Sequence, residues 1–144
     1  MTWCLVGSEM CIRDSYSLNN HIHEKEVSFH LQREINFMPH VADFFRGILI
    51  TGNFSLMSQY SSQEIRNIFD DFYGEHSFIV IKDEFPSISE VINTPNAMIG
   101  GFNIDGSKNR LSFCCSIDNL LKGAASQAIQ NLNNAMNFDE KLGL

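Results

Sequence analysis

The sequence predicts an α+β domain with a mainly antiparallel sheet. With 144 residues, 44% of them hydrophobic, the chain can bury one core but is short for two domains. From residue 16 onward, the helical and strand patterns follow the order helix, strand, helix, strand, hairpin, helix. That order, with a hairpin near its end, is typical of the α+β class.

One helix and two strands are expected before residue 57. Residues 24–34 carry apolar side chains at the spacing of helical turns, which predicts a helix. A short strand is expected at residues 35–38, and Pro39 ends it. Residues 47–56 are rich in β-branched and aromatic side chains, and this composition predicts the next strand.

A helix and a strand are expected between residues 61 and 82. Ser61 and Glu64 have the spacing of a capping box, which predicts a helix that begins there and ends near Gly74. Residues 78–82, with the sequence FIVIK, predict a short buried strand.

The last part of the chain predicts a hairpin followed by a helix. Residues 97–104 and 111–117 have strand composition and flank a loop at residues 105–109 that is rich in turn-forming side chains. Asp118 follows the second strand and can cap a helix over residues 119–136.

The first 15 residues, MTWCLVGSEMCIRDS, differ in character from the rest of the chain. They show no clean period, and they lack the basic start and long apolar run of a signal peptide. The stretch CLVGSEMCIRDS resembles the translated sequencing-adaptor peptide that occurs at the ends of metagenomic assemblies. We therefore expect residues 1–15 to be a non-native scar, residues 16–144 to form the domain, and the natural gene to continue upstream. The alternative is an irregular native arm.

Composition excludes several classes of function. The net charge is −7, which argues against binding to a nucleic-acid backbone because that requires clustered cations. No apolar run approaches the roughly 20 residues needed to span a bilayer. The cysteines are Cys4, Cys11, Cys114 and Cys115. They form no pair of CxxC half-sites and are too few for a small secreted scaffold, so we expect a reducing compartment and buried strand thiols at 114 and 115.

The predicted last helix contains the best candidate binding feature. One face of it is apolar and is formed by Leu121, Ala125, Ala128, Ile129, Leu132 and Met136. Asn119, Gly123 and Gln127 lie four residues apart and would form a polar stripe beside the positive end of the helix dipole, which favours anions such as phosphate. The small residues 123–126 would let another backbone or a ligand approach closely. The alternative is tight packing against the domain's own sheet.

The histidines are candidates for three kinds of role. His21, His23 and His30, close to Glu26, could perform acid–base chemistry or could bind a metal, and they could equally be surface residues. A second cluster follows Pro39, where His40 and Arg46 could hold a carboxylate or phosphate. The alternative for Arg46 is an ordinary surface ion pair.

Residues 21–27, 37–49 and 116–131 (SIDNLLKGAASQAIQN) form three motifs in order along the chain. They resemble the C-terminal half of the N-acetyl-γ-glutamyl-phosphate reductase family of arginine biosynthesis. Residues 21–27 (HIHEKEV) resemble the motif H-R-H-x-P-E-I, and residues 37–49 resemble F-T-P-H-L followed by R-G-I-L. Residues 116–131 match D-N-L-x-K-G-A-A-x-Q-A-x-Q almost without gaps. The resemblance extends from about residue 16 to the end of the chain.

The resemblance implies a fold and a reaction. The fold would be the C-terminal substrate and dimerisation domain of the glyceraldehyde-3-phosphate-dehydrogenase-like type. The reaction would be the NADPH-dependent reduction of an acyl phosphate to N-acetylglutamate semialdehyde through a cysteine thioester. The intact enzyme would be a cytoplasmic homo-oligomer with a small-molecule substrate and with no nucleic-acid or membrane partner.

The resemblance also implies roles for individual residues. The acid–base or thiolate-stabilising histidine would be His21 first and His23 second, and Arg46 with His40 would bind the substrate anion. A second set would lie near NADP, because the last helix of the family packs on the dinucleotide domain. That set is Asn119, Gly123 and Gln127. No residue is assigned to a metal.

The chain departs from the family in ways that affect its activity. Ile22 stands where the motif has arginine and Lys25 where it has proline. The glycine-rich dinucleotide loop and the cysteine segment are not present in the sequence, and neither Cys114 nor Cys115 lies in the right motif to replace the nucleophile. We therefore expect a reductase fragment that is inactive alone. The alternatives are a non-catalytic binding module derived from that domain and a small metal-binding domain built on His21, His23 and His30.

Overall fold

The computed structural model describes residues 12–15, 21–107 and 109–144 and divides into two compact units, residues 1–45 and residues 46–144. The first unit contains strand β1 (Ile12–Ser15), helix α1 (Ile22–Leu31) and strand β2 (His40–Ala42). Strands β1 and β2 pair in antiparallel orientation. The proposed scar, residues 1–15, lies outside the described residues except for its last four, which form β1.

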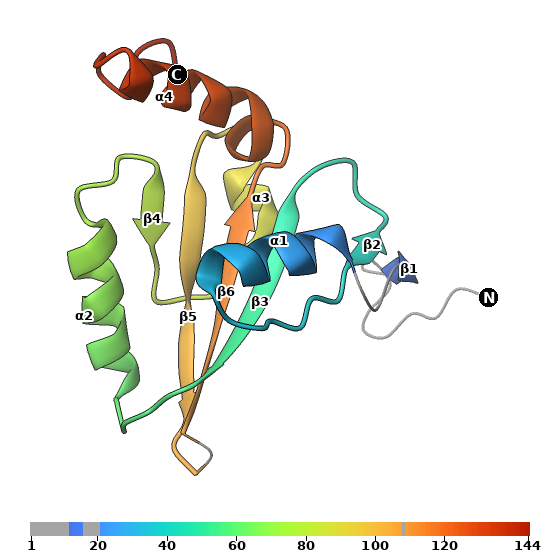
Figure 1. Cartoon of the computed structure of the whole chain (residues 1–144), viewed down its shortest axis with the longest axis vertical. Coiled ribbons are helices and arrows are strands. Elements are labelled where there is room, and N and C mark those ends of the chain that lie inside the picture. The colour runs from blue at the N-terminus through green and yellow to red at the C-terminus, as the bar shows by residue number, and fades with distance from the viewer. Residues whose placement is uncertain (1–11, 16–20, 108) are drawn as a thin grey trace. The chain divides into compact units, whose positions relative to one another are not determined.

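The second unit is built on a four-stranded sheet. Its elements are β3 (Ile48–Ser55), α2 (Ser62–Tyr73), β4 (Ile79–Ile81), α3 (Ile88–Val91), β5 (Ala97–Asp105), β6 (Arg110–Ile117), a π-helix (Leu121–Ala125) and α4 (Ser126–Ala135). The strand order is β3-β6-β5-β4, with β6 antiparallel to both neighbours and β4 parallel to β5. Helix α4 lies across the end of the sheet at which β6 finishes (Figure 1). The predicted α+β class and mainly antiparallel sheet are confirmed.

Helix α2 has the capping box that its sequence predicts. The Glu64 amide donates to Ser61 Oγ over 3.2 Å, and Glu64 Oε2 accepts from the Ser61 amide over 2.7 Å. The helix packs Ile65 into the core and places the Phe69 ring against Phe102 of β5 and Phe113 of β6, with ring centroids 4.8 and 6.0 Å apart. These aromatic contacts hold α2 on the sheet.

The register of strand β5 with β6 shifts between Gly100, which pairs with Cys114, and Asn103, which pairs with Ser112. A Cβ added at Gly100 would lie 2.6 Å from the Glu84 carbonyl oxygen and 2.7 Å from that of Lys82. Both atoms belong to the main chain at the end of β4, so they cannot move aside as a side chain can. Glycine is therefore required where β5 passes the end of β4.

Replacing Gly100 with alanine should lower the free energy of unfolding by about 3 kcal/mol, because the new methyl group overlaps two main-chain oxygens. Gly106→Ala is the matched control, since no atom lies within 4 Å of a Cβ at that position. Urea denaturation of both variants measures the effect. A Gly100→Ala protein as stable as Gly106→Ala would contradict the close approach of β4 and β5.

Two differences from the predicted elements have local causes. Residues 35–38 form no strand, because their amides are already bonded: Ile35 donates to Ser28 Oγ over 3.2 Å and Phe37 to Glu24 Oε2 over 2.9 Å. Helix α1 stops at Leu31 instead of residue 34, since Gln32 adopts the left-handed conformation of a helix C-cap, with φ +51°. The short helix α3 and strand β2 were not predicted.

Candidate functional site

The predicted histidine pair lies at the start of α1. His21 is the N-cap residue, and its Nδ1 accepts a hydrogen bond from the His23 amide over 3.2 Å. The two imidazole rings are 4.8 Å apart, and the Phe37 ring lies 5.1 Å from His21 and 6.1 Å from His23. Because Glu24 holds the Phe37 amide, the loop after α1 is tied to the same helix end. The structure thus brings the two histidines and one aromatic ring together.

The cap bond gives the two histidines different chemistry. Nδ1 of His21 must be unprotonated in order to accept a hydrogen bond from an amide, so neutral His21 carries its proton on Nε2. The His23 side chain makes no cap bond and is exposed at the second helical position. His21 therefore caps the helix, a structural role that His23 does not have.

His40 and Arg46, predicted as a pair, belong to different units. His40 is exposed in the first unit, and its Nδ1 lies 3.0 Å from the Met38 carbonyl oxygen. Because a carbonyl oxygen only accepts, Nδ1 carries the proton in this bond. Arg46 is the first residue of the second unit and is separated from β3 by Gly47.

Arg46 forms a buried ion pair with Asp118. Arg46 Nη2 lies 2.5 Å from Asp118 Oδ2, and Nη1 donates to Asn93 Oδ1 over 3.0 Å. The Asp118 side chain is fully buried, whereas the Arg46 side chain is 19% exposed. Arg46 Nε is buried without a hydrogen-bond partner among the described residues. The pair connects the start of β3, the turn after α3 and the end of β6.

The Asp118 carboxylate is also bonded to the main chain. Its Oδ2 accepts from the Asn93 amide over 2.8 Å, and its Oδ1 accepts from the amides of Leu120 and Leu121 over 2.9 and 3.1 Å. Burial acts to raise the pKa of Asp118, but the hydrogen bonds from Arg46 and these amides outweigh burial and lower the pKa to about 2. Asp118 thus accepts from amides at the start of the last helical segment, as a cap would, but that segment begins at Leu121, with Leu120 at its N-cap position, and not at residue 119 as predicted. Its pairing with Arg46 was not predicted.

A hydrogen bond also connects Gly47 and Asn119, the residues that follow Arg46 and Asp118 in the sequence. The Gly47 amide donates to Asn119 Oδ1 over 2.8 Å. Gly47 has φ +112°, and a Cβ there would lie 2.3 Å from Ile88 Cγ2, so both its backbone conformation and its surroundings require glycine. Asn119 is therefore held by its oxygen atom, next to the Arg46–Asp118 pair.

The polar stripe predicted on the last helix is interrupted. Residues 121–125 form a π-helix, in which Gly123 donates to the Asp118 carbonyl and Ala125 to that of Leu120 over 2.9 and 3.0 Å. The wide turn breaks the regular spacing that would place Asn119, Gly123 and Gln127 on one line. Gln127 bonds Asn131 over 2.9 Å. Gly123 is exposed, and a Cβ there would make only ordinary contacts, so packing within this chain does not require glycine.

The apolar side of α4 faces outward. Ile129, Leu132 and Met136 are 39%, 61% and 57% exposed, whereas the buried residues of the helix are Ser126 and Asn133. The reason lies in the C-terminal segment, because Asn133 Nδ2 donates to the carbonyls of Glu140 and Leu142 over 3.3 and 2.9 Å. Polar side chains therefore fix the chain end, and the apolar side remains uncovered in this chain.

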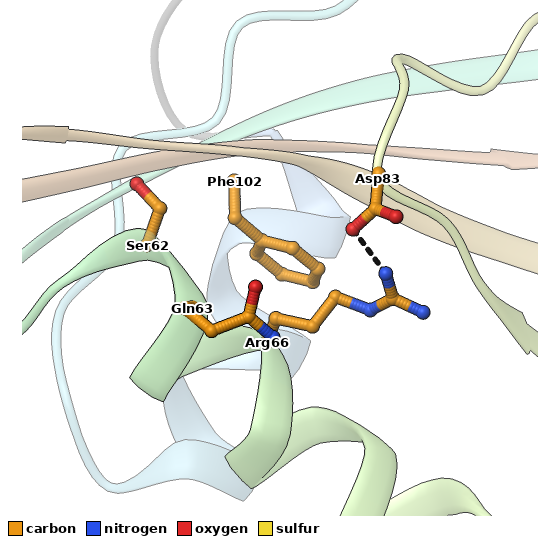
Figure 2. Close-up of a pocket in the computed structure, with 5 residues that line it drawn as sticks. All are labelled: Ser62, Gln63, Arg66, Asp83 and Phe102. Atoms are coloured by element: carbon orange, nitrogen blue, oxygen red, sulfur yellow. Dashed lines mark hydrogen bonds and ion pairs between the residues drawn. The ribbon is translucent and has the colours of Figure 1, made fainter.

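Two other features are poor candidates for a site. A pocket is lined by Ser62, Gln63, Arg66, Asp83 and Phe102 (Figure 2). Its arginine is already paired with Asp83 and with Asp70, so no free cation faces a ligand there. Cys114 and Cys115 are half-buried, and burial raises the pKa of the Cys115 thiol, which disfavours the reactive thiolate.

The described residues also contain no cluster suited to a metal and no membrane-spanning helix. No group of three or more His, Cys, Asp or Glu side chains among them could hold a metal ion. No helix in those ranges is long and apolar enough to cross a membrane. His30 lies in the last turn of α1, at the opposite end from His21 and His23.

Comparison with known proteins defines the class of this chain. Residues 10–119 match the family model of the semialdehyde dehydrogenase dimerisation domain. A crystal structure of aspartate semialdehyde dehydrogenase II from Vibrio cholerae has the same fold, with a TM-score of 0.67 and 15% identity over 81% of this chain and 37% of that chain. The chain belongs to the semialdehyde dehydrogenase dimerisation-domain family.

Sequence relatives narrow the assignment within that class. The chain is 43% identical over 125 residues to N-acetyl-γ-glutamyl-phosphate reductase of Xanthomonas campestris pv. campestris, which covers 87% of this chain and 40% of that protein. It is 44% identical over 129 residues to the mitochondrial protein arg-6 of Neurospora crassa, covering 90% of this chain and 15% of that protein. The chain is thus homologous to the C-terminal part of N-acetyl-γ-glutamyl-phosphate reductases and spans less than half the length of these relatives.

Proposed function

We propose that this chain is the C-terminal part of an NADPH-dependent reductase that converts N-acetyl-γ-glutamyl phosphate to its semialdehyde and phosphate. The observation that carries this proposal is the homology to reductases of that name over 87% of the chain. The outward apolar side of α4 supports it, because such a surface needs a partner such as the cofactor domain that the resemblance implies. Residues 16–144 would form the substrate and dimerisation domain, inactive without the other half.

The residues between β6 and α4 fit a cofactor that approaches from outside. Asn119 is held through its oxygen, and no described group accepts a hydrogen bond from its Nδ2, so that amide can donate to a ligand. The exposed small residues Gly123 and Ala124 leave room for close approach. NADPH would supply the hydride, while this chain would bind and orient the cofactor.

We assign acid–base chemistry to His23 before His21, which reverses the order given by the motif alone. His21 uses Nδ1 to cap α1, whereas the His23 ring is exposed beside it. An exposed imidazole can exchange a proton with a substrate. His40 remains a prediction as an anion-binding residue, whereas the same role for Arg46 would compete with its ion pair to Asp118.

The exposed apolar residues of the second unit support a homo-oligomer. In β3 these are Ile48, Leu49, Ile50 and Phe54. Exposed apolar residues on a strand are ordinarily buried against another protein surface. Together with the dimerisation-domain match, this favours assembly of the intact enzyme into a homo-oligomer. We also propose a cytoplasmic location for the intact enzyme; the Neurospora relative is named mitochondrial.

A fused enzyme tests the proposed function. Residues 16–144 would be joined behind the part of the Xanthomonas reductase that precedes the matched region. We expect phosphate-dependent formation of NADPH from N-acetylglutamate semialdehyde and NADP⁺, whereas the 144-residue chain alone should show none. Folded fused protein without activity would favour the second candidate, a non-catalytic binding module that uses the exposed side of α4.

A further inference from the structure

We propose that Arg46 is a positioning residue: paired with Asp118, it fixes the peptide group of Gly47 and thereby the side-chain amide of Asn119. Only the last step, in which Asn119 faces the cofactor, rests on the proposed function. The earlier steps concern contacts within this chain. The proposal differs from the sequence prediction, in which Arg46 binds the substrate anion.

The first step is that the Arg46 guanidinium is already committed. One terminal nitrogen lies 2.5 Å from Asp118 Oδ2 and the other donates to Asn93 Oδ1 over 3.0 Å. A substrate anion that took Arg46 away would leave the fully buried Asp118 carboxylate without its cation, which is strongly unfavourable. The arrangement therefore favours a fixed arginine over one that exchanges partners during a reaction.

The second step is that a fixed Arg46 fixes the next peptide group. Arg46 supplies the carbonyl group of the peptide bond whose N–H belongs to Gly47. On the other side of that peptide, the Gly47 Cα lies so close to Ile88 that even a methyl group would overlap it, at 2.3 Å. The ion pair and Ile88 together hold the direction of the Gly47 N–H.

The third step concerns the orientation of the Asn119 amide. A backbone N–H only donates, so the Asn119 atom that lies 2.8 Å from it must be the oxygen. The two hydrogens of Nδ2 then point away from Gly47, and no described residue accepts a hydrogen bond from them. A carboxamide held in this way presents a preoriented donor to a carbonyl or phosphate oxygen of a ligand.

Amide hydrogen exchange tests the first two steps in the 144-residue chain itself. We expect the Gly47 amide to be protected, and Arg46→Gln to increase its exchange rate about tenfold or more, because the anchor is lost. Arg66→Gln is the matched control, since Arg66 also forms ion pairs, with Asp70 and Asp83, but away from Gly47. Unchanged exchange at Gly47 in Arg46→Gln would overturn the proposal.

Kinetics of the fused reductase test the last step. Arg46→Gln should lower kcat/KM for NADP⁺ about 10- to 100-fold, as expected for misplacement of a binding group, with little change in the KM for the semialdehyde. In an Asn119→Ala background, Arg46→Gln should add little further loss, because both changes remove the same contact. A raised KM for semialdehyde or phosphate, additive with Asn119→Ala, would overturn the proposal and make Arg46 an anion-binding residue.

The two failures are distinguishable. If the unsubstituted fusion has no activity, the proposed function fails. The exchange measurement still decides whether Arg46 holds Gly47, because it needs no cofactor, no substrate and no upstream domain.

Discussion

Asp118→Ala should lower the free energy of unfolding by about 3–5 kcal/mol, the usual cost of removing one partner of a buried ion pair. The substitution leaves the Arg46 charge without its carboxylate. It also removes the acceptor for the amides of Asn93, Leu120 and Leu121. Since domains are stable by only about 5–15 kcal/mol, this loss is a large fraction of the whole stability of the domain.

Urea denaturation measures this loss, and an exposed ion pair, Asp83–Arg66, provides the control. Asp83 also pairs with an arginine, Arg66, but the Asp83 side chain is 72% exposed, so Asp83→Ala should cost no more than about 1 kcal/mol. If the two alanine variants were equally stable, Asp118 would not be the anchor that its contacts indicate.

The same pair should make stability depend on pH in a definite range. The pKa of Asp118 is lowered in the folded chain from 3.8 to about 2, so folding favours its charged form. This contribution is fully present above about pH 4 and is lost as the pH falls from about 4 to 2. Asp118→Asn has no proton to gain there, so the stability difference between the native chain and Asp118→Asn should shrink over that range.

Local sequence signals predicted most of the second unit. The capping box of Ser61 and Glu64 begins α2 as expected, and the β5–β6 hairpin encloses the predicted loop. Helix α3 has the same signal, since Glu90 accepts from the Ser87 amide over 2.8 Å, but at four residues it is too short for a helical period to show. Local sequence motifs therefore predicted α2 and the hairpin. Helix α3 was missed because it is too short to show a helical pattern in the sequence.

The contacts between distant residues could not be predicted in the same way. Arg46 and Asp118 are 72 positions apart, and each has a common local role, a surface cation and a helix cap. Their pairing depends on β3 and β6 lying side by side with Ile48 opposite Ile117, a register that no local motif specifies. The positive φ of Asn93, at the turn after α3, was also beyond sequence reasoning.

The outward side of α4 shows a related limit. Its apolar period is correct, and the sequence left open whether that side packs on the domain's own sheet or on something else. What decides the question in this chain is the folding back of residues 137–144, whose carbonyls bind Asn133. Because Asn133 is buried by these hydrogen bonds, the polar side of α4 faces the protein and the apolar side faces outward, the opposite of the usual arrangement.

In the fused reductase, His23→Asn should reduce kcat by a factor on the order of 10² to 10⁴, the usual contribution of a general acid–base group. His21→Asn should reduce kcat less than about tenfold, because asparagine is among the best N-cap residues and preserves the start of α1. His21→Ala, which removes the cap, should destabilise the protein by about 1 kcal/mol while leaving kcat above that of His23→Asn.

The contrast between the two asparagine variants separates capping from catalysis. Both remove an imidazole, but only at position 21 does the replacement restore the hydrogen bond that the structure shows, from the His23 amide to the capping side chain. A loss of kcat in His21→Asn as large as in His23→Asn would assign the proton transfer to His21 instead. Full activity in both variants would place the acid–base group outside this motif.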